Sequence, residues 1–123
     1  MTTWGVVVVL AAVTMNAVSG VLWVARPRRV LPGLQKNLAA IGVPESWATF
    51  PIGTLKLAGA AGLLAGLVGV PYVGTAAAAG LILFWVCAIF SHVRVGDWST
   101  PQFYATSCVF LPLAAGALAA TVV

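Results

Sequence analysis

The sequence predicts an all-α protein: a four-helix transmembrane bundle that runs up-down-up-down, with a short interfacial segment between the first and second helices. Two features of composition point to a membrane. Mean hydropathy is +1.08, and 62% of the 123 residues are hydrophobic while 7% are charged. A water-soluble domain of this length cannot bury so much apolar surface. A third feature points to helices, because the apolar residues form four continuous runs, each of about the 20 residues that cross a bilayer, where barrel strands would alternate.

The four runs cover residues 4–25, 51–70, 72–92 and 101–122, and we expect them to form one transmembrane domain over residues 1–123. The first run begins MTTWGVVVVL, which lacks the positively charged start of a secretory signal. We therefore expect it to stay in place as the first helix. Pro27 opposes its continuation beyond residue 25.

The segment after the first helix reads VLPGLQKNLAAIGVPESWATF, which is too polar to cross a membrane and too apolar for a free linker. Leu34, Leu38 and Ile41 have helical spacing and share one side. This pattern predicts a short helix or re-entrant segment at the membrane interface, ended by Pro44 and Glu45.

Two turns connect the remaining helices. Only the turn around Pro71 separates the second helix from the third, so these two must be antiparallel neighbours. Gly96 and Pro101 favour a turn between the third and fourth helices, and Ser99 or Thr100 is a candidate N-cap for the fourth.

Basic residues predict the orientation, because cytoplasmic loops near helix ends are enriched in lysine and arginine. Four lie after the first helix and one after the third: Arg26, Arg28, Arg29, Lys36 and Arg94. We therefore expect both termini outside a cell (inner) membrane and both longer loops in the cytoplasm. This topology accounts for the net charge of +4 and leaves a nucleic-acid partner without support. The high content of alanine, glycine and valine suggests a bacterial source.

Small residues predict close contact between helices. The second run carries glycines three and four residues apart, at Gly59, Gly62, Gly66 and Gly69, and Asn16 lies among small residues of the first run. Helices in lipid associate through van der Waals contact across such residues and through interhelical hydrogen bonds. The same faces could bind another membrane protein or a second copy of this chain.

Lys56 is the one charged residue placed inside an expected helix, at a depth of about 8 Å by helical rise. One interpretation is that its stem runs along the helix and lifts the ammonium to the interface. The other is that the ammonium faces inward and meets a carboxylate or an oxygen of a ligand.

His92, Arg94 and Asp97 lie together where the third helix leaves the membrane, on the same side as Lys56. This cluster fits interfacial ion pairing, and it also fits a site for a polar head group or a quinone carbonyl, or for proton transfer. One histidine with Asp97 and Glu45 supplies too few ligands, so we predict no metal site.

Cys87 and Cys108 could be brought level by adjacent antiparallel helices, so a disulfide is geometrically possible. No C-x-x-C spacing supports redox work, and we expect both thiols to be reduced packing residues. Most of the tryptophans lie near predicted helix ends, where they are typical interface anchors: Trp4, Trp23, Trp47 and Trp98.

The stretch over residues 50–98 resembles the core of DoxX-like membrane proteins. It reads FPIGTLKLAGAAGLLAGLVGVPYVGTAAAAGLILFWVCAIFSHVRVGDW. A glycine-rich second helix, a proline turn, an alanine-rich third helix and a terminal His-x-x-x-x-Asp recur in that family. The matching positions are Gly53, Lys56, Gly59, Gly62, Pro71, Ala88, His92 and Asp97. The first and fourth helices agree in number and length.

The resemblance implies a four-helix integral membrane protein. Relatives of this kind include a small subunit associated with thiosulfate:quinone oxidoreductase, membrane partners of redox-stress complexes, and eukaryotic assembly factors for ion channels. Many members carry glutamate where this chain has Lys56, so a role that needs a carboxylate there does not transfer.

Two functions therefore stay open. The first is an accessory or assembly subunit, not an enzyme on its own, that binds a membrane partner or itself through small-residue faces. The second is a quinone- or lipid-binding component of a membrane oxidoreductase, in which Lys56, His92, Asp97 and Arg94 receive the polar head group. The helix centres offer too few polar groups to line the path of a channel.

Overall fold

The computed structural model describes residues 1–122, and every regular element in this range is a helix, without a strand. The helices in chain order are α1 (Thr3–Ala25), α2 (Leu31–Ile41), η1 (Glu45–Ala48), η2 (Thr49–Gly53), α3 (Thr54–Leu67), α4 (Val73–Arg94), α5 (Pro101–Ala105), η3 (Thr106–Phe110) and α6 (Leu111–Val122). Four stretches are long and apolar enough to cross a membrane: Thr3–Ala25, Glu45–Leu67, Val73–Arg94 and Pro101–Val122. The predicted fold class is confirmed.

The second and fourth spans are segmented helices. The second begins at Glu45, six residues before the predicted start, with a 3-10 turn (η1) and a π-type turn (η2) ahead of α3. In the fourth, the π-type turn η3 ends two residues before Pro112, which has no amide hydrogen to donate. The Leu111 amide donates instead to the carbonyl of Thr106, five residues back. Prolines thus set where these two spans depart from α-helical geometry.

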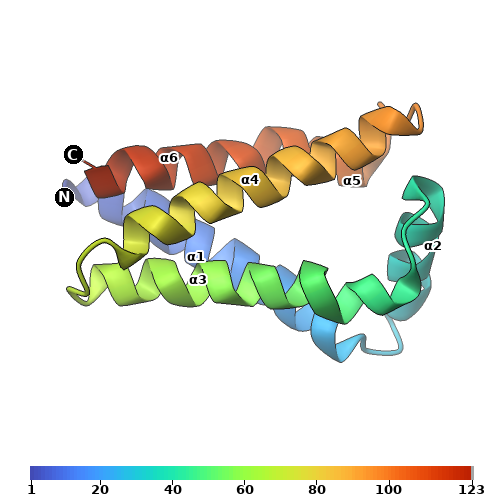
Figure 1. Cartoon of the computed structure of the whole chain (residues 1–123), viewed down its shortest axis with the longest axis horizontal. Helices are drawn as coiled ribbons and strands as arrows, with labels where there is room; N and C mark the ends of the chain where they lie inside the picture. Colours follow the sequence, from blue (N-terminus) through green and yellow to red (C-terminus); the bar gives the residue numbers. More distant parts are fainter. Residues whose placement is uncertain (123) are drawn as a thin grey trace.

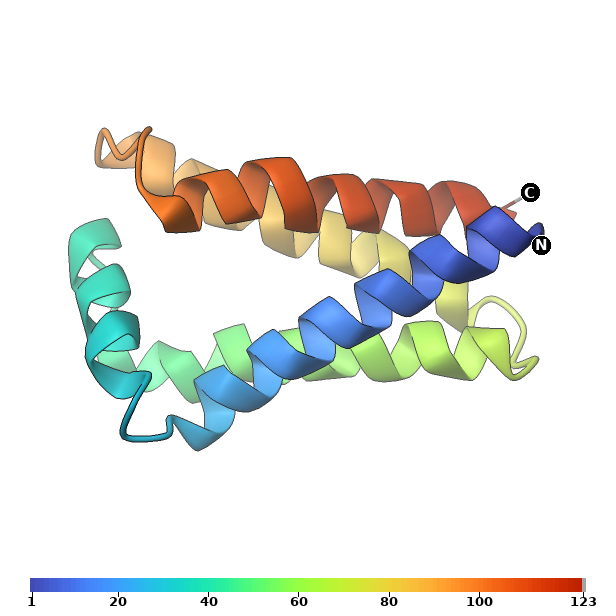
Figure 2. The ribbon, with the colours of Figure 1, turned by 180° about the vertical axis from the view of Figure 1, so that it is seen from behind.

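The four spans form a ring in which α1 packs on α3, α3 on α4, α4 on α6, and α6 on α1. Figures 1 and 2 show both termini at one end of the bundle and α2 lying across the other. The helices are close together at the terminal end and diverge toward α2. The backbones of the four spans are therefore farther apart at the α2 end than at the terminal end.

Glycine closes the terminal end, because Gly62 and Gly66 let α3 approach α4 closely. A Cβ added at Gly66 would lie 2.7 Å from the Cα of Gly74, and one at Gly62 would lie 2.6 Å from the Cβ of Ala77. Gly59 faces Leu81 in the same contact. Gly69, predicted to continue this stripe, instead lies beyond the end of α3 in the turn, at φ +103°, a conformation that favours glycine.

Asn16 ties α1 to α4 inside the bundle. It is fully buried, its Nδ2 donates to the carbonyl of Ala12 (2.8 Å), and its Oδ1 accepts from Nε1 of Trp85 (3.2 Å). Both polar ends of the buried amide are therefore satisfied by groups of the chain itself.

The interfacial segment is the helix α2, which Pro32 helps to start and Gly42 ends with a φ of +71°. Its apolar side faces the bundle, where Leu38 packs with Trp23 and Ala48. Trp23 is therefore only 8% exposed, and the prediction that it anchors the interface is wrong, because α2 folds over it. Trp4, Trp47 and Trp98 are exposed.

Candidate functional site

A cavity of about 510 Å³ lies between the diverging helices, on the α2 side of the core. All four spans and α2 contribute to its lining, and most of that lining is apolar. The polar and aromatic residues that decide its chemistry are Ser19, Trp23, Lys56, Trp85 and His92. A cavity of this size falls in the range of sites that bind small organic molecules.

Lys56 points into this cavity. Its side chain is 4% exposed, and its Nζ donates to Oγ of Ser19 at 2.8 Å. The ammonium also lies over the rings of Trp23 (4.7 Å to the centroid) and Trp85 (5.0 Å). The interpretation in which the stem carries the ammonium to the interface is wrong. The ammonium is instead buried inside the bundle, where Ser19 and two tryptophan rings surround it.

No carboxylate approaches Lys56 within the described residues. The two ion pairs found there are Arg26 with Glu45 (3.8 Å) and His92 with Asp97 (2.6 Å). An ammonium has three hydrogen-bond donors, and only the one to Ser19 is used. The aromatic rings offset part of the desolvation of the charge, but two donors remain for an oxygen of a bound molecule.

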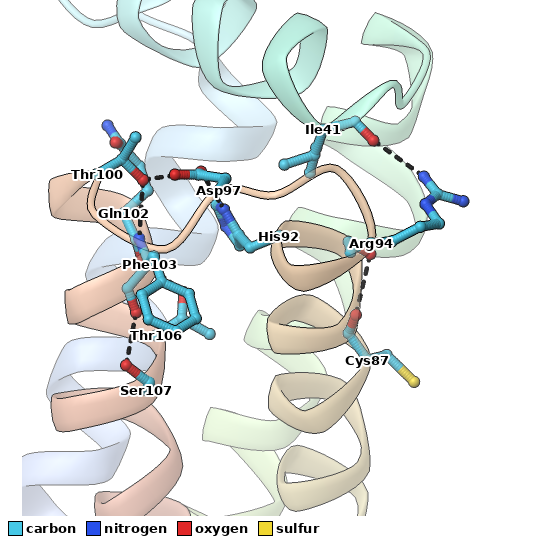
Figure 3. A network of polar contacts seen from close by, with 11 residues as sticks. Ile41, Cys87, His92, Arg94, Asp97, Thr100, Gln102, Phe103, Thr106 and Ser107 are labelled. Atoms are coloured by element: carbon cyan, nitrogen blue, oxygen red, sulfur yellow. Dashed lines mark hydrogen bonds and ion pairs between the residues drawn. The ribbon is translucent and has the colours of Figure 1, made fainter.

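His92 and Asp97 form a hydrogen-bonded pair at the α4 end of the cavity (Figure 3). Nδ1 of His92 lies 2.6 Å from Oδ2 of Asp97, which also accepts from Oγ1 of Thr100 (2.9 Å). The hydrogen bond from His92, followed by that from Thr100, holds the pKa of Asp97 below its ordinary value of 3.8, so the carboxylate is ionised at neutral pH. An ionised carboxylate only accepts, so Nδ1 carries the hydrogen and Nε2 is left for another partner.

Arg94 lies away from this pair. Figure 3 shows His92 and Arg94 leaving the end of α4 in opposite directions, and Nη2 of Arg94 donates to the carbonyl of Ile41 at 3.0 Å. This bond ties α4 to the C-terminal end of α2. Of the four predicted ligand-binding residues, Lys56 and His92 line the cavity, Asp97 orients His92, and Arg94 holds the helix that covers the cavity end.

Sequence reasoning passed over Ser19 and Trp85. Ser19 lies one turn before Trp23 and faces the same cavity, and Trp85 lies two turns before His92 on α4. One signal was present: Trp85 is the tryptophan placed at the middle of an expected helix, far from an interface. No local sequence pattern predicts the hydrogen bond between Ser19 and Lys56, because the two residues are 37 positions apart.

Cys87 and Cys108 are both free and exposed, and only Cys87 lines the cavity. Within residues 1–122, no group of three or more histidine, cysteine, aspartate or glutamate side chains is placed to hold a metal ion. The cavity offers hydrogen bonds, one positive charge and aromatic surface.

Four apolar crossing helices around a partly polar internal cavity define a small multi-pass membrane protein. The chain belongs to the DoxX-like family, whose model matches residues 6–121. The match confirms the resemblance drawn from residues 50–98 and extends it over the first and fourth helices. No curated protein and no solved structure matches the chain significantly.

Proposed function

We propose that this chain binds a membrane-soluble molecule with an oxygen-bearing polar head, a quinone or a lipid, and holds it for a membrane oxidoreductase. The observation that carries the proposal is Lys56: an ammonium buried in a cavity, with two free donors and no carboxylate partner among residues 1–122. A buried charge of this kind costs stability unless it meets an acceptor. An oxygen of the head group would supply that acceptor.

The surroundings of Lys56 favour a flat, conjugated head. Trp23 and Trp85 both lie within 5.0 Å of the ammonium, and Trp85 stacks on Phe110 with ring centroids 4.2 Å apart. Aromatic side chains that line the cavity would pack against a quinone ring, edge-on or offset. Negative charge that develops on the quinone oxygen during reduction would be stabilised by the ammonium.

Two observations favoured an accessory or assembly subunit, and one of them no longer does. Its first support was the glycine stripe, and Gly59, Gly62 and Gly66 are used inside the chain, against α4. Its second support, the scarcity of reactive groups, still stands. The two proposals are compatible, because a subunit that only holds a quinone needs a partner to supply the electrons.

The test is a titration of the purified protein in mild detergent with decylubiquinone. Trp23 and Trp85 serve as reporters, since a quinone bound between them quenches their fluorescence. We expect saturable quenching by the wild type and loss of at least about tenfold in affinity in Lys56→Met, the equivalent of one charge-assisted hydrogen bond. Lys36→Met is the matched control, because Lys36 is exposed on α2.

Equal quenching of wild type and Lys56→Met would show that the quinone does not bind at Lys56. In that case the same titration with a fatty acid, followed by displacement of a fluorescent analogue, tests the lipid alternative. Failure of both ligands to depend on Lys56 would contradict the proposal.

A further inference from the structure

The cavity reaches the surface of the bundle between α3 and α4. Four of its lining residues there are exposed: Leu55 on α3, and Gly80, Leu83 and Cys87 on α4. The three α4 residues are three and four positions apart and so lie on one helix face. Leu83 is 68% exposed although it lines the cavity. We call these four residues the side opening.

The opening lies beside the contact between α3 and α4, two helices that Figure 1 shows diverging from the turn that joins them toward the α2 end. At the turn the two backbones touch, with Gly66 against Gly74. At Gly80, farther along α4, an added Cβ would meet nothing within 4 Å. Leu81, the next residue, still packs on Gly59 of α3, so Gly80 lies beside this contact, on an open face of α4 that lines the cavity.

The opposite side of the cavity is more closed. There α1, η3 and α5 contribute side chains that are buried or half-buried, such as Trp23, Thr106 and Phe110. Gln102 is exposed, but it lies in the first turn of the fourth span, near the membrane surface. The end of the cavity is covered by α2, which Arg94 holds through the carbonyl of Ile41.

The side opening lies at the depth of the lipid tails. Gly80 and Cys87 are about 10 and 21 Å along α4 from Val73 by helical rise, in a helix of 22 residues. Both positions fall within a hydrocarbon layer of about 30 Å. What borders the opening is therefore lipid.

We propose that the ligand enters and leaves from the lipid through the side opening, head first, and that its apolar tail then occupies the gap between Leu55 and Leu83. This inference rests on the proposed function and narrows its ligand class. The ligand is a long-tailed amphiphile dissolved in the membrane.

Entry is tested by stopped-flow quenching with decylubiquinone, using the whole chain in lipid nanodiscs. Gly80→Phe should narrow the opening without disturbing the fold, since space is free at that position. We expect its association rate to fall about tenfold, within the range over which mutants of one site change this rate. Ala79→Phe is the matched control, because Ala79 is exposed on α4 and does not line the cavity.

The two natural cysteines give a second measurement that needs no large substitution. Cys87 borders the opening and Cys108 does not, and both are exposed. In nanodiscs, saturating decylubiquinone should slow the reaction of Cys87 with a lipid-soluble maleimide at least about fivefold, as occupancy of most sites by mass action requires, and leave Cys108 unchanged. Mass spectrometry of the two tryptic peptides separates their rates.

The outcomes separate this inference from the proposed function. Equal association rates for the two phenylalanine variants, together with no protection of Cys87, would overturn the side opening while Lys56-dependent binding stands. If neither decylubiquinone nor the fatty acid bound more weakly to Lys56→Met than to the wild type, the proposed function and this inference would be overturned together. Slower entry in Gly80→Phe with protection of Cys87 alone supports the side opening.

Discussion

Lys56 is the residue at which stability and binding are in conflict. Its ammonium is buried with one hydroxyl partner and aromatic rings, and no described carboxylate neutralises it. Replacement of buried charged groups by hydrophobic side chains of similar volume is often stabilising. A buried charge that lowers the stability of the fold is typical of a functional site, where activity is favoured over stability.

The first prediction concerns the same Lys56→Met variant without ligand. We expect its free energy of unfolding to rise by at least about 1 kcal/mol, because methionine keeps the length of the side chain and removes the buried charge. Denaturation in mixed micelles measures the change, with Lys36→Met as the control that should show none. Destabilisation of the protein by Lys56→Met would show that the contacts with Ser19, Trp23 and Trp85 are structural supports.

The second prediction concerns pH. Because the pKa of Asp97 is lowered in the folded protein, mainly by the His92 hydrogen bond, its stabilisation is present above the ordinary value of 3.8 and is lost as the pH falls through the folded value. The difference in unfolding midpoint between wild type and Asp97→Asn should stay constant from about pH 7 to pH 5 and shrink below about pH 4. Glu45→Gln, at an exposed carboxylate whose ion pair with Arg26 is long (3.8 Å), is the comparison variant.

A difference between wild type and Asp97→Asn that disappears already between pH 7 and pH 5 would contradict this assignment. It would mean that a group other than the Asp97 carboxylate controls the turn between α4 and α5.

At the scale of elements, the contact between α3 and α4 determines where the bundle is closed. Gly66 meets the backbone of Gly74 with no side chain between them, whereas Gly80 faces open space. One pair of helices therefore contains both a close backbone contact and an open position that lines the cavity. Close approach at one end and divergence at the other follow from where small residues lie along the two helices.

The third prediction compares alanine at these two glycines. Gly66→Ala should destabilise the protein by about 1–3 kcal/mol, because the added methyl overlaps backbone that cannot move aside. Gly80→Ala should stabilise it by about 0.5–1 kcal/mol through the better helix propensity of alanine. Unfolding in mixed micelles measures both. Equal effects at the two positions would contradict the packing described here.

The four spans could be predicted from the sequence, because hydropathy and length are properties of local segments. The segmented start of the second span at Glu45 could not be predicted, because this stretch is polar and resembles the interfacial segment before it. The site was predicted in part: Lys56 and His92 were named, but Ser19 and Trp85 depend on contacts between distant helices. The inward direction of Lys56 is likewise a product of tertiary packing around Trp23.

For the whole molecule, an even number of crossings places the two termini on one side, in agreement with their position in Figures 1 and 2. The side itself is predicted from Arg26, Arg28, Arg29 and Arg94, which lie at the α2 end. A fourth prediction follows for intact cells that express a variant without Cys87 and Cys108. In that background Thr2→Cys should react with a membrane-impermeant maleimide, and Gly33→Cys should react only after permeabilisation. The reverse pattern would invert the topology.

The architecture as a whole separates two tasks. The terminal end is packed with glycine, alanine and leucine and holds the bundle together, while the α2 end encloses the cavity with its one buried charge. The central claim is that this cavity holds an oxygen-headed amphiphile through Lys56.

Mass spectrometry of the intact protein, released from mild detergent, tests that claim most directly by counting the molecules that remain bound. The wild type and Lys36→Met should each carry one quinone or lipid per chain, and Lys56→Met should carry none. The same bound mass at the same occupancy in all three proteins, or no bound mass in the wild type, would contradict the account.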